Sequence, residues 1–234
     1  IIRHSGKNKK YLNATVFIVK CSFFNNTSST QGGAVLMMNI NHIYMHNNIF
    51  IGNKGKSGGA VGLSKLISAI QTRSIFLSNS AKVDGGGMCI AKAIFVTITH
   101  SKMKDNFSGQ KGGGISFKIV NDTKLLSTAF IENLSKQNGG GAFLKFGNII
   151  AVNSTVYLGN LAKHYGGGLY TEQLYMVINT NCKFIGNNAE KYEGGGALSK
   201  LGNIFRANNS DFHGNRASKY GGGVFCEKYI HVTH

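Results

Sequence analysis

The chain has 234 residues, with 32 glycines and no proline or tryptophan, so every backbone N–H can join a continuous hydrogen-bonded ladder. Hydrophobic residues make up 42%, which argues against wholesale disorder, and no apolar run reaches the roughly 18 residues of a membrane-spanning helix. The 26 Lys and Arg exceed the 9 Asp and Glu, giving a net charge of +17, which favours polyanionic partners and leaves few carboxylates for catalysis.

The chain opens on a basic segment. Residues 1–10 include Arg3, Lys7 and Lys9, and we expect them to form an N-terminal segment or cap. From residue 11 to residue 234 no linker interrupts the sequence pattern, which predicts one continuous domain.

Three series of residues repeat with one period along the chain. Glycine pairs or triplets end at eight positions 26 to 28 residues apart, from Gly33 to Gly223. Eight asparagines, from Asn26 to Asn215, keep the same spacing, and the residue three positions before each is aromatic except at Met103. A shared period of about 27 residues predicts a repeat architecture.

The segments between the glycine runs are short and rich in residues that favour strands. Residues 93–97 read Ala-Ile-Phe-Val-Thr, and residues 155–158 read Thr-Val-Tyr-Leu. About three short strands and three turns fit in one repeat, which is one rung of a parallel β-helix. We therefore predict an all-β fold, a single β-solenoid of roughly eight to nine rungs spaced about 4.8 Å apart.

Each series has a structural task in such a rung. The aromatic residues point inward and stack, the asparagines form an amide ladder between rungs, and the glycines allow positive φ and close backbone approach at a tight corner. The predicted ladder residues are Asn26, Asn53, Asn79, Asn106, Asn133, Asn160, Asn187 and Asn215, together with Phe23, Phe50, Phe76, Phe130, Tyr157, Phe184 and Phe212.

The pairing of Phe-x-x-Asn with Gly-Gly-Ala-Val, as at Gly32–Val35 and Gly58–Val61, resembles the repeats of chlamydial polymorphic outer-membrane proteins and of similar secreted or surface proteins in eukaryotes. The resemblance covers the chain from about Tyr11 to His234. It implies a right-handed parallel β-helix outside the cell, in a family whose members act as adhesins or have no assigned activity. The later corners depart from the bacterial pattern by reading Gly-Gly-Gly. The shared motifs belong to the scaffold, so no catalytic residue is carried over.

The acidic residues are not arranged as polysaccharide-cleaving β-helix enzymes require, with two or three carboxylates on neighbouring rungs. Asp84 and Asp105 occupy different positions in the repeat, and Glu190 and Glu193 share one turn. We therefore predict that the protein is not an enzyme and needs no cofactor.

The histidines and cysteines predict neither a metal site nor a disulfide. His42 and His46 would lie ~13 Å apart on one strand, too far to hold one metal ion. The cysteines fall on rungs too distant for the ~7 Å Cα separation that a disulfide allows. We expect four free, mostly buried thiols, at Cys21, Cys89, Cys182 and Cys226.

Two sets of lysines recur with the repeat, one after the asparagine series and one after the glycine runs. Stacked rung on rung, each set would form a basic stripe. The stripe is either a solvated surface that blocks sideways aggregation or a track for an acidic glycan, a mineral or, least favoured, nucleic acid. The candidate polyanion-binding residues are Lys56, Lys82, Lys136, Lys163, Lys191 and Lys219 in the first set and Lys65, Lys92, Lys118, Lys145, Lys200 and Lys228 in the second.

Sequons for N-glycosylation occur both inside and outside the ladder. Those on Asn26, Asn106 and Asn133 belong to the ladder and are expected to be inaccessible. The sequons expected to carry glycans if the source is a eukaryote are those on Asn13, Asn25, Asn121, Asn153 and Asn208.

These features favour an extracellular structural protein, secreted or at the cell surface. It would be a rigid β-solenoid rod that stacks head to tail into fibres or a matrix, with lysine stripes facing an anionic glycan or mineral. The alternative is a cell-surface adhesin or glycan-binding module. A filament former assembles without a ligand, whereas an adhesin stays monomeric and has a discrete site.

Overall fold

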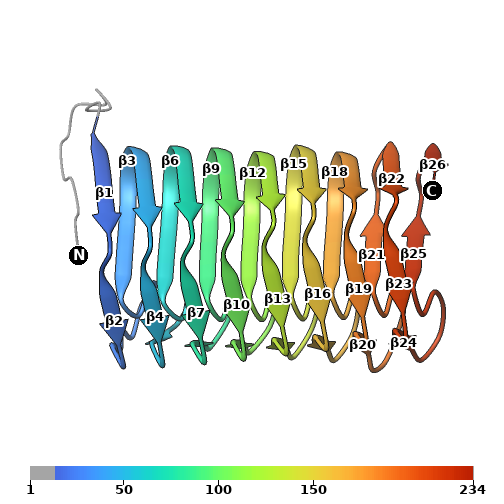
Figure 1. The fold of residues 1–234 in the computed structure, drawn as a ribbon, viewed down its shortest axis with the longest axis horizontal. Helices are drawn as coiled ribbons and strands as arrows, with labels where there is room; N and C mark the ends of the chain where they lie inside the picture. Colours follow the sequence, from blue (N-terminus) through green and yellow to red (C-terminus); the bar gives the residue numbers. More distant parts are fainter. Residues whose placement is uncertain (1–13, 234) are drawn as a thin grey trace.

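The protein is a stack of β-coils along one axis (Figure 1). The computed structural model describes residues 14–233, and within that range the chain forms 26 strands, pairs them in parallel and contains no helix that could cross a membrane. The all-β solenoid with about 27 residues per coil is confirmed. The expectation of a cap at residues 1–10 lies outside the described residues.

The strands fall into three sheets, here called long, middle and short. The long sheet contains β1 (Thr15–Val19), β3 (Val35–His46), β6 (Val61–Thr72), β9 (Met88–Thr99), β12 (Ile115–Leu126), β15 (Ala142–Asn153), β18 (Leu169–Thr180), β21 (Ala197–Lys200), β22 (Ile204–Asn208), β25 (Val224–Glu227) and β26 (His231–Thr233). The middle sheet contains β2 (Ser22–Phe24), β4 (Ile49–Ile51), β7 (Ile75–Leu77), β10 (Lys102–Lys104), β13 (Ala129–Ile131), β16 (Val156–Leu158), β19 (Lys183–Ile185) and β23 (Asp211–His213). The short sheet contains β5 (Lys54–Gly55), β8 (Ser80–Ala81), β11 (Phe107–Ser108), β14 (Leu134–Ser135), β17 (Leu161–Ala162), β20 (Asn188–Ala189) and β24 (Arg216–Ala217).

The register places each residue on the equivalent residue of the next coil. Ile115 in β12, for example, pairs with Met88 on one side and Ala142 on the other. Equivalent residues therefore form straight columns along the rod, and alternate columns in a strand point into the coil or out of it. The inward columns of the long and middle sheets meet in one hydrophobic core.

The aromatic column of the middle sheet is confirmed. Neighbouring rings stack with centroids 4.5 to 5.0 Å apart, from Phe23 to Phe76 and again from Phe130 to Phe212. Met103 occupies the column between the two stacks. The members from Phe50 to Phe184 are fully buried, so each contributes hydrophobic burial as well as ring stacking.

The asparagine ladder is also confirmed, and it satisfies every polar atom of its inner members. Asn53 Nδ2 donates to Asn79 Oδ1 and to the carbonyl oxygen of Phe23, both at 3.0 Å. The Asn53 backbone N–H donates to the same Asn79 Oδ1 at 3.0 Å. Its own Oδ1 accepts two hydrogen bonds from Asn26. The pattern continues to Asn215 and ties successive coils together at one corner.

A second polar ladder, which the sequence analysis did not predict, holds the opposite end of the middle sheet. The backbone N–H of Asn48 donates to Ser74 Oγ, and that of Ser74 donates to Ser101 Oγ, each at 3.2 Å. At both ladders the preceding residue has positive φ, as at Arg73 (48°) and Glu132 (52°). Each corner is thus a left-handed residue followed by a side chain that hydrogen-bonds along the rod. The column comprises Cys21, Asn48, Ser74, Ser101, Thr128, Thr155, Cys182 and Ser210.

The glycine runs form the third corner. The first glycine of each run has positive φ, between 61° and 71°. A later glycine is needed for space: a Cβ on Gly141 would lie 2.6 Å from the carbonyl oxygen of Gly168 in the next coil. Both expected tasks of the glycines, left-handed backbone and close approach, therefore occur at this corner.

One buried hydroxyl group in the aromatic column lowers the stability of the fold. The Tyr157 hydroxyl is fully buried without a hydrogen-bond partner, and burial raises the pKa of the phenol well above its usual 10.0. We expect Tyr157→Phe to stabilise the fold by about 1 kcal/mol at neutral pH. In the unmodified protein the unfolded chain loses this proton near pH 10 while the folded chain keeps it, so stability is full below pH 10 and falls as the pH rises above it.

Urea unfolding of Tyr157→Phe at pH 7 and above pH 10 tests both points. The gain in the free energy of unfolding of Tyr157→Phe over the unmodified protein should be larger at the higher pH. Burial also raises the pKa of Cys89 to about 12, which lowers stability above pH 9 in both proteins and cancels in the comparison. Tyr175→Phe, at a side chain that is 50% exposed, should change little at either pH. A less stable Tyr157→Phe would mean that the hydroxyl is held by a partner.

Candidate functional site

The carboxylates are dispersed along the rod. Glu172 and Glu227 share a column of the long sheet, but Lys200 lies between them and pairs with both in the register. Asp84 is buried, and its Oδ2 lies 3.0 Å from Lys118 Nζ. Within residues 14–233 no three His, Cys, Asp or Glu side chains are grouped as metal ligands would be. His42 and His46 instead bond to hydroxyls, His42 Nδ1 to Ser68 at 2.7 Å and His46 Nδ1 to Thr72 at 2.5 Å.

The four cysteines have free thiols. Cys89 and Cys182 are buried, whereas Cys21 and Cys226 are half-buried. Cys21 and Cys182 lie in the second polar ladder, where each thiol meets the carbonyl oxygen two residues earlier at 3.3 Å. Burial raises the pKa of Cys226 to about 12, as for Cys89, so these two thiols are not activated nucleophiles.

The second lysine set does not form the single stripe that was expected. Lys118, Lys145 and Lys200 share one column, where Glu172 and Glu227 alternate with them. Lys145 Nζ lies 3.2 Å from Glu172, and Lys200 Nζ lies 2.8 Å from Glu227. The hydrogen bond from Lys200 lowers the pKa of Glu227. Ion pairing therefore neutralises much of this column.

The other three lysines of the second set, Lys65, Lys92 and Lys228, occupy the adjacent column. Lys92 pairs with Ile119 in the register, so an apolar side chain follows it along the rod. All three are exposed. The set is divided because its members occupy two neighbouring positions of the strand: Lys118, Lys145 and Lys200 follow the first glycine of the run by six residues, and the other three follow it by seven.

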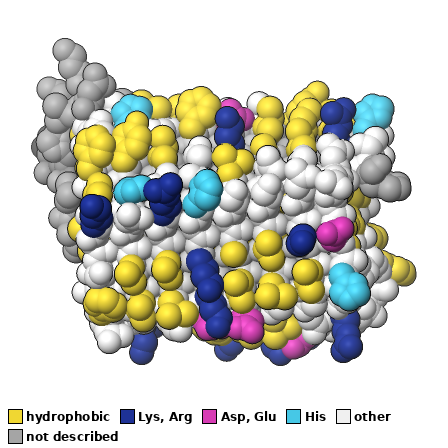
Figure 2. Space-filling model, viewed as in Figure 1, with side chains coloured by type: hydrophobic (Ala, Val, Ile, Leu, Met, Phe, Trp, Pro, Cys, Tyr) yellow, Lys and Arg dark blue, Asp and Glu magenta, His cyan; other side chains and the backbone are white. Residues whose placement is uncertain are grey.

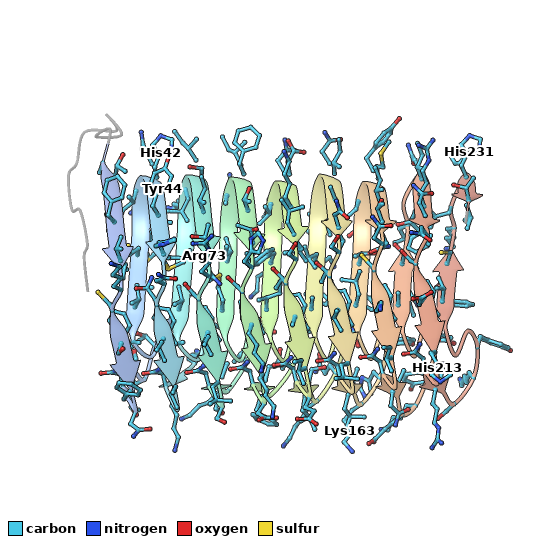
Figure 3. All side chains as sticks on the ribbon, in the orientation of Figure 1. His42, Tyr44, Arg73, Lys163, His213 and His231 are labelled. Atoms are coloured by element: carbon cyan, nitrogen blue, oxygen red, sulfur yellow. The ribbon has the colours of Figure 1, made fainter. Side chains whose placement is uncertain are left out.

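The first lysine set lies beside the asparagine corner and keeps more of its charge. Backbone hydrogen bonds place Lys82, Lys136 and Lys163 at one position of the coil, three residues after the ladder asparagine, and Lys56 occupies the same position. Lys56, Lys82 and Lys136 are exposed and have no ion pair with any described carboxylate. We call Lys56, Lys82, Lys136 and Lys163 the corner lysines. Figure 3 labels Lys163 at this edge of the rod.

The corner lysines do not extend over the whole rod. Gly109 occupies the equivalent position in the coil between Lys82 and Lys136. Glu190 occupies it in the coil after Lys163, and Glu190 Oε2 lies 2.6 Å from Lys163 Nζ. Lys191 and Lys219, the last two of the set, lie one residue further along the chain. Lys219 Nζ sits 4.8 Å from the ring centroid of Tyr192.

Tyrosines near the glycine corner stack on one another. The rings of Tyr165 and Tyr192 are 4.6 Å apart, and Lys200 Nζ lies 4.5 Å from the Tyr165 centroid. Their faces are therefore occupied by each other and by lysines. Tyr220, with 64% of its side chain exposed, is the most open ring of this cluster.

The sequons differ in accessibility. Asn25, Asn121, Asn153 and Asn208 are exposed, while Asn13 lies outside the described residues. Asn106 and Asn133 are buried in the ladder as expected. The expectation was wrong for Asn26, which is exposed because no described coil lies on its outer side.

The sequence analysis missed a further feature, the apolar outer surface of the middle sheet. The residues on each side of the inward aromatic residue point outward, and most of them are aliphatic. The signal was present in the sequence as Ile-Phe-Ile at residues 49–51, Ile-Phe-Leu at 75–77 and Val-Tyr-Leu at 156–158.

Parallel coils, an amide ladder and glycine corners define the class of this protein as a β-solenoid repeat protein. The family model of the Chlamydia polymorphic membrane protein repeat matches residues 20–36, which span the first ladder asparagine and the first glycine run. No curated protein and no solved structure gave a match. The chain is a β-helix repeat protein like the chlamydial polymorphic membrane proteins. The match covers part of one repeat of the solenoid.

Proposed function

We propose that the protein is an extracellular, adhesin-like rod that binds acidic polysaccharides along the corner lysines. The observation that carries the proposal is the line of exposed, carboxylate-free lysines at Lys56, Lys82 and Lys136 on a scaffold with fixed coil spacing. Their amines point from a backbone that is hydrogen-bonded in every coil, so binding would not require the backbone to be ordered first. The net charge of +17 would attract a polyanion from a distance.

Binding to heparin and to a neutral dextran at low and high salt tests this function. We expect heparin to bind at low salt and to be released as salt screens the charges, and dextran not to bind. The triple variant Lys56→Gln, Lys82→Gln and Lys136→Gln should weaken heparin binding at least tenfold.

The matched control is the triple variant Lys65→Gln, Lys92→Gln and Lys228→Gln. It removes the same net charge from exposed lysines at the column interrupted by Ile119. If the two triple variants weaken heparin binding equally, only the net charge matters and the corner lysines are not a site. If unmodified protein does not bind heparin at low salt, the proposed function is wrong.

A second candidate function is assembly of rods end to end into fibres or a matrix. The observation that favours it is a cavity of about 470 Å³ at the C-terminal end of the described coils, lined by core residues such as Phe212, Val224 and Cys226. Another coil of the same pattern, from this chain or from a second copy, would fill this cavity. Electron microscopy without ligand separates the candidates: filaments support assembly, and isolated short rods at every salt concentration argue against it.

A further inference from the structure

The outer surface of the middle sheet carries two columns of side chains that flank the buried aromatic column. Parallel pairing of the eight strands aligns them from β2 to β23. Ten of these sixteen outward positions are apolar, although the solvated face of a sheet is normally polar. We call them the aliphatic face: Phe24, Ile49, Ile51, Ile75, Leu77, Ala129, Ile131, Val156, Leu158 and Ile185.

The aliphatic face is open to solvent. Phe24 is 56% exposed, Ile75 41% and Leu158 39%, and the other members are half-buried. Figure 2 views this side of the rod and shows two rows of apolar side chains, divided by basic side chains near the centre. Apolar side chains gathered on one face in this way mark a contact site rather than ordinary scattered surface residues.

Basic residues lie on the aliphatic face and along its edge. Lys102 points outward between Ile75 and Ala129, and Lys183 points outward between Val156 and Asp211; both lysines are exposed. Lys104 lies beside them and pairs with Glu132 at 3.4 Å. Lys20 and Arg73 stand exposed at the left-handed turn that precedes the middle sheet; Figure 3 labels Arg73.

The occupant of this face must combine apolar surface with negative charge. A second copy does not fit side by side on this face, because two rods of net charge +17 packed along their length would repel each other. Protein interfaces are centred on Tyr, Trp, Met and Arg, whereas this face is flat and aliphatic with one aromatic residue, Phe24. An anionic lipid bilayer supplies both an apolar interior and a negative headgroup layer, and basic side chains around an apolar surface are the usual means of binding it.

We propose that the aliphatic face rests on an anionic lipid surface, with the rod lying parallel to the membrane plane. The aliphatic side chains enter the boundary between headgroups and acyl chains. Lys102, Lys183, Lys20 and Arg73 contact the headgroups. This surface is separate from the corner lysines, so it provides a lipid contact in addition to the proposed polysaccharide binding.

Co-sedimentation with vesicles tests the proposal. We expect the full chain to bind vesicles of equal parts phosphatidylserine and phosphatidylcholine, and to bind phosphatidylcholine alone at least tenfold more weakly. The double variant Ile75→Asn and Leu158→Asn should weaken binding to the mixed vesicles at least tenfold. The double variant Lys102→Gln and Lys183→Gln should weaken it roughly 5- to 25-fold, since each cation near an anionic surface contributes about fivefold.

Matched controls lie on the other sides of the rod. Ile94→Asn with Ile119→Asn replaces side chains of similar exposure, 44% and 49%, on the long sheet. Lys65→Gln with Lys92→Gln removes the same charge as the lysine variant. Circular dichroism of each variant confirms that the coils remain folded.

Several outcomes would overturn the proposal. These are no binding to the mixed vesicles, equal loss in the face variants and their controls, or binding that is unchanged when phosphatidylserine is absent. Binding of a folded acidic protein, but not of vesicles, would assign the face to a protein partner instead. The triple corner-lysine variant should keep its vesicle binding, so a failure here is distinguishable from a failure of the polysaccharide site.

Discussion

Asn133→Ala should destabilise the protein by about 4 kcal/mol. Asn133 Oδ1 accepts from the backbone N–H and the Nδ2 of Asn106, and Asn133 Nδ2 donates to the carbonyl oxygen of Met103. The variant removes the partners of the Asn106 backbone N–H and of the Met103 carbonyl oxygen, and it removes one of the two hydrogen bonds of Asn106 Nδ2. Each such loss costs about 1–3 kcal/mol. Urea unfolding with linear extrapolation measures the change in the free energy of unfolding.

The matched control is Asn148→Ala, at an exposed asparagine of the long sheet. It should lie within about 0.5 kcal/mol of the unmodified protein. If Asn133→Ala and Asn148→Ala lower the free energy of unfolding by the same small amount, the amide ladder does not stabilise the coils. The stability of the coils would then depend on the apolar core. A loss near 4 kcal/mol at Asn133 alone would establish the ladder as a main source of stability.

Phe130→Ala should cost about 3–5 kcal/mol, the usual range for emptying a phenylalanine site in a core. Phe130 is fully buried, lies against Tyr157 at a centroid distance of 5.0 Å and pairs with Met103 on the other side. Its removal opens a cavity between two coils. Because each coil of a solenoid contacts only its neighbours, a break at the centre of the rod weakens the coupling between its two halves.

Phe95→Ala is the comparison for this prediction. Phe95 is 49% exposed on the long sheet, so its truncation should cost less than about 1 kcal/mol. Urea unfolding of Phe130→Ala should also show a broader transition if the two halves separate. Equal losses at Phe95 and Phe130 would contradict a core built on the aromatic column.

Periodicity made the scaffold predictable. The Asn, aromatic and Gly series each perform a task that a neighbouring coil must match, so a residue at one position constrains the residue 27 positions later. Asn53 needs Asn79 as an acceptor, and position 141 must be glycine because a Cβ there would lie 2.6 Å from the carbonyl oxygen of Gly168 in the next coil. Such constraints are visible in a single sequence, because the protein repeats them eight times.

The second polar ladder could not be predicted in the same way. Its positions hold Cys, Asn, Ser or Thr, since any short side chain that offers an acceptor to the next N–H can serve, as Asn48 does for Cys21 and Ser74 does for Asn48. A function that several residue types fulfil leaves little trace in composition. The positive φ before each corner is similarly hidden, since it falls on Arg73 and Glu132 as well as on glycine.

The sequence by itself determined the class of fold, the length of the coil, and the residues that stack and hydrogen-bond along the rod, because these depend on identity and period alone. The tertiary structure decided which charged and apolar side chains share a column. Lys118 follows Lys92 by 26 residues in coils that pair with an offset of 27, so the two fall in adjacent columns, whereas Glu172 follows Lys145 by 27 and lies beside it. Whether a lysine is free or paired, and whether an isoleucine is covered or open, depends on neighbours one coil away.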